Sequence, residues 1–353
     1  MSLIPPSDEQ GLGQGYHSPQ VDVDVRLNTN ESPLPPPAAW VEELQAEVGR
    51  IPFHRYPDRD ATELRAAIGD LHGVEPGQVF CANGSNEVLQ TLLLTYGGPG
   101  RTAAVFEPTY ALHGHICRLT RTAVAEGERN DDFTLDLVEV KRVLSEHRPA
   151  VTFLCSPNNP TGRVEPRDVV AHVLELAPGL VVVDEAYGQF AAWSALSLMG
   201  EGRPVVVVRT FSKTWSMAAA RLGYLVGPAE LVSELEKRAL PYHLDAMKQA
   251  AGRLALRHRA EMDARVAALV EERGRLAAAL GEMDVDTWPS EANFILFRPR
   301  RAGGDQVWRA LLDRSVLIRN CSSWPRLDGC LRVTVGTPEE NSAFLAALAQ
   351  ALA

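Results

Sequence analysis

The residues of this chain with the clearest chemical potential lie in the stretch RTFSKTWSMAAARLGY. It follows four consecutive valines, Val205–Val208, and such an apolar run predicts a strand that is buried on both faces. Lys213 comes just after that strand, where burial of an ammonium group is costly. Thr210 and Ser212 precede it, and the cation Arg221 follows. This setting suits a lysine that acts as a neutral nucleophile near pH 7, although a solvated lysine at a turn is the alternative.

A second polar cluster is NGSNE, in which Gly84, Ser85 and Asn86 precede an apolar helical segment. Gly84 permits a tight turn, and the next two residues bring hydroxyl and backbone N–H donors to the start of a helix. Such a helix start can bind a phosphate group. The alternative is an ordinary helix cap, for which serine and asparagine are also favoured.

Two more clusters follow apolar runs that predict buried strands. SPNNPTG comes after Val151–Cys155, and its prolines and glycine predict a rigid turn that would hold the amide of Asn159 toward a ligand. DEAY comes after Leu180–Val183, and its Asp184 needs a cation or an N–H partner if it is buried. A purely structural turn and a structural ion pair with an arginine are the alternatives.

These clusters are expected to meet, because ligands of open α/β sheets bind beyond the carboxyl ends of the strands. Together they fit a pyridine ring with a phosphate. Asp184 would keep the ring nitrogen protonated, while Asn159 and Tyr187 would bond to the phenolic oxygen. Lys213 would bind the aldehyde covalently. The phosphate would be held by Ser85, Thr210, Ser212 and Arg221. These are the groups by which a protein tunes pyridoxal 5′-phosphate.

The elements that must position these residues alternate between strands and helices from about residue 51 to 227. This alternation predicts an α/β domain with a mainly parallel sheet covered by helices. The expected strands are 103–106, 151–155, 180–183, 205–208 and 224–226, and the expected helices include 61–71, 87–96, 135–146 and 167–176. A long helical region at 231–280 and strands at 293–297, 316–318 and 331–335 predict a smaller α/β domain, with helices at 306–312 and 338–352. We expect an arm at 1–28, a connector with a helix that packs on the small domain at 29–50, a large domain at 51–240 and a small C-terminal domain at 241–353.

The composition excludes several classes of function. The formal net charge of −10 does not suit a partner such as nucleic acid or an anionic membrane. No apolar run is as long as a bilayer span, and no G-x-G-x-x-G follows a predicted strand, which excludes a nicotinamide-binding Rossmann enzyme. The five cysteines show no close pairing and the N-terminus shows no secretion signal, so a cytoplasmic protein is expected. For His113 and His115 a solvated or capping role is expected, and no metal site is predicted.

The chain resembles the fold-type I pyridoxal-phosphate aminotransferases, and most closely the histidinol-phosphate aminotransferase family. The motifs that carry the resemblance, in chain order, are RLNTNESP, RYPD, NGSNE, EPTY, SPNNPTG, DEAY, the Ser-Lys segment and LRVTVGT. The resemblance implies a homodimer that transaminates histidinol phosphate with 2-oxoglutarate, in histidine biosynthesis. In this family pattern Lys213 binds the cofactor and carries the proton, Tyr110 stacks on the ring, and Tyr56 reaches the cofactor phosphate of the neighbouring subunit.

The resemblance also implies substrate contacts. Arg332 would bind the substrate anion, Arg319 would join it on the phosphate, and Asn30 and Tyr16 would complete the site. One arginine can bind a carboxylate, whereas a second cation suits a phosphate monoester. If Arg319 instead pairs with a neighbouring acid, an aromatic amino-acid aminotransferase is the alternative function. A lyase or decarboxylase on the same scaffold also remains open, whereas a cofactor-sensing regulator is disfavoured because no basic helix-turn-helix segment exists.

The segment after Lys213 departs from the family pattern. A glycine-rich stretch is usual there, but this chain has TWSMAAA. Trp215 and Met217 are therefore expected to add bulk near the cofactor.

Overall fold

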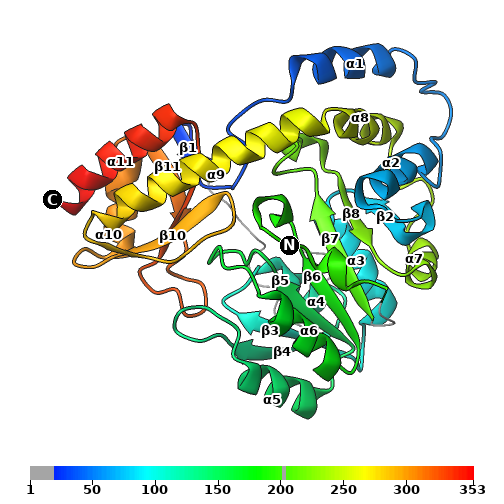
Figure 1. The fold of residues 1–353 in the computed structure, drawn as a ribbon, viewed down its shortest axis with the longest axis horizontal. Helices are drawn as coiled ribbons and strands as arrows, with labels where there is room; N and C mark the ends of the chain where they lie inside the picture. The colour runs from blue at the N-terminus through cyan, green and yellow to red at the C-terminus, as the bar shows by residue number, and fades with distance from the viewer. Residues whose placement is uncertain (1–19, 201–203) are drawn as a thin grey trace, which may run out of the picture.

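The computed structural model describes residues 20–200 and 204–353, which form two sheets surrounded by helices (Figure 1). The larger sheet has the strand order β2-β8-β7-β6-β5-β3-β4. Its strands are β2 Val79–Ala82, β3 Thr102–Glu107, β4 Ala123–Glu128, β5 Val151–Cys155, β6 Leu180–Asp184, β7 Val205–Thr210 and β8 Gly223–Val226. Within these described strands only β8 runs against its neighbours. The prediction of a mainly parallel sheet is confirmed.

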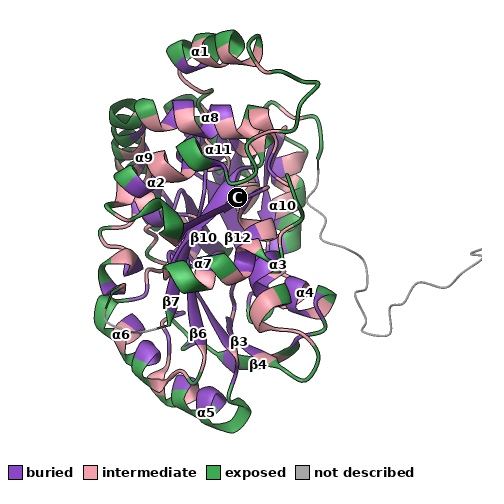
Figure 2. Ribbon diagram, turned by 90° about the vertical axis from the view of Figure 1, so that its right-hand side faces the viewer, coloured by how far each residue is buried: buried purple, intermediate pink, exposed green. Residues whose placement is uncertain are grey.

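Helices cover both faces of this sheet, which explains its valine-rich strands. The covering helices are α3 Ser85–Tyr96, α4 Leu112–Leu119 and α7 Ala229–Glu236 on one face, and α5 Leu137–His147 and α6 Arg167–Leu176 on the other. Val182 and Val206 belong to the first core, whereas Val181 and Val207 belong to the second. Figure 2 shows the buried strands between helices whose outer sides are exposed. The carboxyl ends of β5, β6 and β7 are thus fixed side by side.

A third core lies where β2 and β8 meet α1 Ala38–Val48, α2 Thr62–His72 and α8 Ala246–Arg257. Trp40 of α1 belongs to this core, and its indole N–H donates to the carbonyl of Ala251 in α8 at 3.1 Å. Trp215 and Met217 are buried in the same core. The core therefore takes up the two large side chains that follow Lys213.

The smaller sheet has the strand order β1-β11-β12-β10-β9. Its strands are β1 Val25–Leu27, β9 Val285–Thr287, β10 Phe294–Pro299, β11 Val316–Asn320 and β12 Leu331–Thr334. The helices against it are α9 Arg259–Gly281, α10 Gly304–Leu312 and α11 Pro338–Leu352. Helix α9 runs from the side of α8 to this sheet (Figure 1). Helix α11 begins with a capping box between Thr337 and Glu340, as the TPEE sequence favours.

Some expectations about the elements were incomplete. Strand β1 lies within the expected arm and pairs in parallel with β11, with Val25 opposite Val316. Strands β2, β4 and β9 and helix α4 were not predicted, because their apolar runs are short or interrupted by polar residues. The expected long helical region is broken between α7 and α8, around Pro241. The proposed domain boundaries stay predictions. No helix in the described ranges combines the length and apolar character needed to cross a bilayer.

Candidate active site

A cavity of about 370 Å³ lies at the carboxyl ends of β5, β6 and β7 and extends to β12. Twelve of the predicted site residues line it: Asn30, Ser85, Asn86, Tyr110, Asn159, Asp184, Tyr187, Thr210, Ser212, Lys213, Arg221 and Arg332. Thr29 and Glu31, which sequence reasoning did not single out, also line it. The tertiary structure therefore joins clusters that are far apart in the chain.

Lys213 projects its amine into this cavity from the turn after β7. Nζ donates a hydrogen bond to the carbonyl of Thr29 at 3.0 Å and lies 5.8 Å from the ring centroid of Tyr187. The pKa of Lys213 is lowered to about 7, chiefly because burial removes the hydration of its amine; the charges of Arg332 and Arg221 contribute in the same direction, and Glu31 opposes them. A substantial fraction of the amine is therefore neutral at physiological pH, as a nucleophile requires.

Asp184 is buried at the end of β6, and its partner is a histidine rather than an arginine. The ring of His113 donates from Nε2 to Oδ2 of Asp184 at 3.0 Å, and Oδ1 accepts from the backbone N–H of Ala186 at 3.1 Å. His113 is 1% exposed, and its ring stacks on Phe153 with centroids 4.7 Å apart. The expected solvated or capping role of His113 was wrong, because α4 packs it against the sheet.

The neighbour of Asp184 has a different task. Glu185 is buried against Arg209, with Oε2 2.6 Å from Nη2, and it also accepts from Ser194. Of these two neighbours, Glu185 forms the structural ion pair and Asp184 lines the cavity.

Arg332, Asn159 and Asn30 line the cavity in two hydrogen-bonded pairs, Arg332 with Asn159 and Asn30 with Tyr187. Nη1 of Arg332 donates to Oδ1 of Asn159, and Nη2 donates to the carbonyl of Asn28 at 3.1 Å. Because the amide oxygen of Asn159 accepts from Arg332, its Nδ2 group is the part that can donate to a ligand oxygen. Asn30 donates from Nδ2 to the hydroxyl of Tyr187 at 2.9 Å. The guanidinium and the amides are thereby held in fixed orientations.

Tyr187 is suited to donate a hydrogen bond into the cavity. Burial raises the pKa of its phenol well above the ordinary value, and Arg332 and the bond from Asn30 oppose this only in part. The phenol therefore stays protonated at physiological pH. Its ring is fixed edge-on against Phe294 of β10, with centroids 5.0 Å apart.

The start of α3 and the residues around it form a polar cradle of the kind that binds a phosphate group. Gly84 precedes the helix with φ +83°, and a Cβ there would lie 2.8 Å from Nη2 of Arg221. The helix N-terminus is not capped by a side chain of its N-cap residue. Thr210 donates to Ser212 at 3.0 Å, and Arg221 donates from Nη1 to Ser212 at 3.2 Å. Two hydroxyls, a guanidinium and a helix start thus converge, and they fit the phosphate of pyridoxal phosphate.

Tyr110 lies between this cradle and the Asp184 pair. Its hydroxyl donates to Oδ1 of Asn86 at 3.3 Å. Its ring meets the ring of His113 edge to face, with centroids 5.3 Å apart. An aromatic ring at this place fits the predicted stacking role against a flat cofactor ring.

Three of the predicted residues that the structure describes do not line the cavity. Gly84 lies just behind it and shapes the cradle. Arg319 is buried opposite Arg332 on the adjacent strand. Tyr56 is 79% exposed and stacks on Tyr242 with centroids 4.5 Å apart. Tyr16 lies outside the described residues. The expectation that Trp215 and Met217 add bulk near the cofactor was wrong, since they belong to the core under α1 and only Ala218 and Ala219 of that segment line the cavity.

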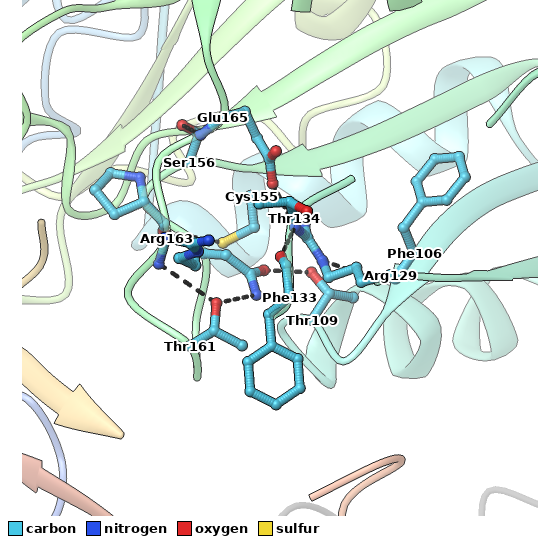
Figure 3. Close-up of polar contacts among 12 residues, drawn as sticks. Phe106, Thr109, Arg129, Phe133, Thr134, Cys155, Ser156, Thr161, Arg163 and Glu165 are labelled. Atoms are coloured by element: carbon cyan, nitrogen blue, oxygen red, sulfur yellow. Dashed lines mark hydrogen bonds and ion pairs between the residues drawn. The ribbon is translucent and has the colours of Figure 1, made fainter. Parts of the chain in front are cut away.

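The turn that carries Asn159 is held by a buried polar network that sequence reasoning missed. Asn158 is fully buried; it accepts from Thr109 at 3.0 Å and donates to Thr161 at 2.9 Å. Behind the turn, Arg129 forms a buried ion pair with Glu165 (Figure 3). The repeated asparagine in SPNNPTG was the available signal for this support.

Comparisons with known proteins agree with this geometry. Residues 22–348 match the family described as aminotransferase class I and II. The chain is 44% identical to the histidinol-phosphate aminotransferase of Corynebacterium diphtheriae, over 96% of this chain and 94% of the relative. It is 45% identical to that of Streptomyces avermitilis, over 98% of this chain and 96% of the relative.

The fold is also shared with solved structures. The histidinol-phosphate aminotransferase of Sinorhizobium meliloti, solved in complex with pyridoxal-5′-phosphate, superposes with a TM-score of 0.84 and 21% identity, over 94% of this chain and 91% of that one. The predicted fold type is thereby confirmed. From its sequence relatives, this chain belongs to the class I and II aminotransferases and, within them, to the histidinol-phosphate aminotransferase family.

Proposed function

We propose that this protein transaminates L-histidinol phosphate with 2-oxoglutarate, with pyridoxal 5′-phosphate as its cofactor. The observation that carries the proposal is one cavity that holds Lys213, with its pKa near 7, and the buried cation Arg332. The first group can react with the cofactor aldehyde and move protons. The second can bind an anionic substrate. Pyridoxal phosphate, when bound, supplies a protonated pyridine ring that accepts electron density from the substrate carbon.

Each residue of the chain has a defined part in this proposal. Lys213 binds the aldehyde, and its amine carries the proton to and from the substrate carbon. Asp184, oriented by His113 and the N–H of Ala186, keeps the ring nitrogen protonated. Asn159 and Tyr187 donate to the phenolic oxygen. The phosphate is held by Ser85, Thr210, Ser212 and Arg221, and Tyr110 stacks on the ring.

The substrate phosphate is assigned to the arginines of the small sheet. Arg332 and Arg319 are register partners on β12 and β11 and are 4% and 7% exposed. Two guanidiniums suit the charge of a phosphate monoester better than that of a carboxylate. Asn30 and Tyr16 are proposed to complete the substrate site.

A second candidate, transamination of phenylalanine or tyrosine, is favoured by one specific observation. Of the two arginines only Arg332 lines the cavity, and a single arginine is sufficient for an α-carboxylate. This activity would use the same lysine and cofactor contacts, so the two candidates differ in donor alone.

We also propose a homodimer in which Tyr56 reaches the cofactor phosphate of the partner subunit. Tyr56 and Tyr242 form a stacked aromatic pair, 79% and 41% exposed, and Phe53 and Leu240, which are close to them in the sequence, are 68% and 77% exposed. An aromatic patch of this kind is typical of a protein interface. A cytoplasmic location is proposed because all five cysteines are buried and free.

The test is to record the visible absorbance of the bound cofactor while histidinol phosphate, phenylalanine or glutamate is added separately. The proposal expects histidinol phosphate to change the spectrum at a lower concentration than phenylalanine. The reaction products are then identified, because a lyase or decarboxylase would release a different product from the same donor. A spectrum that responds to phenylalanine alone would establish the second candidate.

A further inference from the structure

Trp324 lies in the loop between β11 and β12 and contacts both arginines of the proposed phosphate site. Its ring centroid is 5.3 Å from Cζ of Arg319 and 5.9 Å from Cζ of Arg332. Trp324 does not itself line the cavity described above. Any effect it has on substrate is therefore exerted through the guanidiniums.

Arg319 and Arg332 bring two positive charges close together at buried positions. Arg319 and Arg332 are directly opposite on antiparallel strands, so their side chains lie on the same face of the sheet. Like charges at such positions repel, and burial strengthens the repulsion. The face of an indole ring carries negative charge density and attracts guanidinium groups within about 6 Å. One ring that contacts both cations offsets part of their repulsion.

The loop holds the indole ring in a defined place. The backbone N–H of Trp324 donates to the carbonyl of Cys321 at 2.9 Å, and that of Leu327 donates to the carbonyl of Trp324 at 3.1 Å. Arg326 connects the loop to the segment between β4 and α5. It donates to the carbonyl of Arg129 and to the carboxylate of Asp131, the latter at 3.1 Å. The loop that carries the ring is therefore held by its own backbone hydrogen bonds and by contacts with the segment between β4 and α5.

We propose that Trp324 is a positioning residue that holds Arg319 and Arg332 side by side as a two-arginine clamp for the substrate phosphate. The inference rests on the proposed function, because the clamp has its full value only for a phosphorylated donor. It assigns a specificity role to a loop residue that neither the motifs nor the cavity lining identify.

The experiment measures the half-reaction of the cofactor-loaded protein with histidinol phosphate, as a maximal rate and a half-saturating concentration. In Trp324→Leu the half-saturating concentration should rise roughly tenfold, the size expected for a desolvated cation–π contact. The maximal rate should change less than about threefold, because the groups that react are untouched. Trp324→Phe keeps an aromatic face and should recover most of the affinity.

Trp288 provides a matched control. It is also a partly buried tryptophan packed on the cluster that contains Cys321 and Leu327, and its ring lies 5.7 Å from Cζ of another arginine, Arg298. Arg298 is exposed and pairs with Asp286 outside the cavity. Trp288→Leu should therefore leave both kinetic values unchanged while it removes a similar amount of packing.

Two results would overturn the inference: an unchanged half-saturating concentration in Trp324→Leu, or an equal rise in Trp288→Leu. If Trp324→Leu does not fold, Trp324→Phe decides, with a rise of a few-fold expected because phenylalanine has the weaker ring field. If the wild-type protein reacts with phenylalanine and not with histidinol phosphate, the proposed function fails. In that case the half-saturating concentration of phenylalanine is measured for the same variants, because its carboxylate would bind Arg332.

Discussion

The ring of His113 donates to the buried carboxylate of Asp184 across 3.0 Å, from the helix that follows β3 to the end of β6. The two side chains are 0% and 1% exposed, so neither can exchange this partner for water. Asp184 is thereby held toward the cavity, while Glu185 pairs with the structural arginine, Arg209. His113 is the residue through which the fold positions the carboxylate proposed to face the cofactor ring.

Replacement of His113 by phenylalanine should weaken both stability and turnover. The substitution keeps the ring packing on Phe153 but removes the donor to a buried carboxylate, which costs about 1–3 kcal/mol. We expect a lower midpoint in urea denaturation and a transamination rate reduced by about tenfold or more. His115→Phe, on the same helix, is the control. Equal effects of the two variants would argue against a specific role of His113.

Lys213→Ala should abolish transamination while some cofactor stays bound by its phosphate and ring contacts. Loss of both the covalent bond and the proton carrier should reduce the rate by more than about a thousandfold. The measurement is product formation with a separate assay of bound cofactor. Lys237→Ala, which removes a 59% exposed lysine paired with Glu234, is the control for loss of a lysine as such. A rate near that of the wild-type protein in Lys213→Ala would contradict the site.

The rate of cofactor incorporation should depend on pH through Lys213. Its pKa of about 7 means that the neutral, reactive amine increases as the pH rises through 7 and is nearly complete above about pH 8. The rate of incorporation into cofactor-free protein should therefore rise about tenfold per pH unit below pH 7 and level off above it. Arg332→Leu removes a cation that lowers this pKa, so its profile should shift to higher pH. An unshifted profile would show that Arg332 does not act on the amine.

Gly84→Ala should weaken cofactor binding by roughly tenfold, because the new methyl group displaces Arg221 from the phosphate cradle. Gly73→Ala is a matched control: Gly73 has φ +67° and no atom within 4 Å of a new Cβ. Both variants carry backbone strain: about 1 kcal/mol for the left-handed conformation of Gly73, and about 1–3 kcal/mol for Gly84, whose ψ of 165° lies in a region almost restricted to glycine. Only Gly84→Ala should change the dissociation constant in a cofactor titration. A similar loss of affinity in both would attribute the effect to strain.

Tyr56 can be tested by mixing two inactive subunits. Tyr56→Ala and Lys213→Ala should each be impaired alone, but a mixed dimer places both defects in one site and leaves the other intact. Random mixing should restore about a quarter of the wild-type activity. No recovery, with mixed dimers verified by two affinity tags, would show that Tyr56 acts within its own subunit or not at all.

Local sequence patterns were enough to predict most of the fold and most of the predicted site residues that line the cavity. The valine runs of β6 and β7 and the polar turns that follow them are short-range signals, because a strand buried on both faces needs apolar residues throughout. Asp184, Asn159 and Lys213 stand out because each lies at the end of such a run or in the turn that follows it. The parallel arrangement then requires their side chains to meet at one edge of the sheet.

Only the tertiary structure decided which partner each of these groups has. His113 and Asp184 are 71 positions apart in the chain, and Asn30 and Tyr187 are 157 positions apart. Trp324 contacts two arginines that lie on different strands on either side of its loop. Periodicity carries no information about which distant side chain fills a given place. The large side chain of Trp215 illustrates the same limit. Its effect on the cofactor site depended on whether it pointed into the cavity or into the core beneath α1, and packing against α1 and α8 determined this.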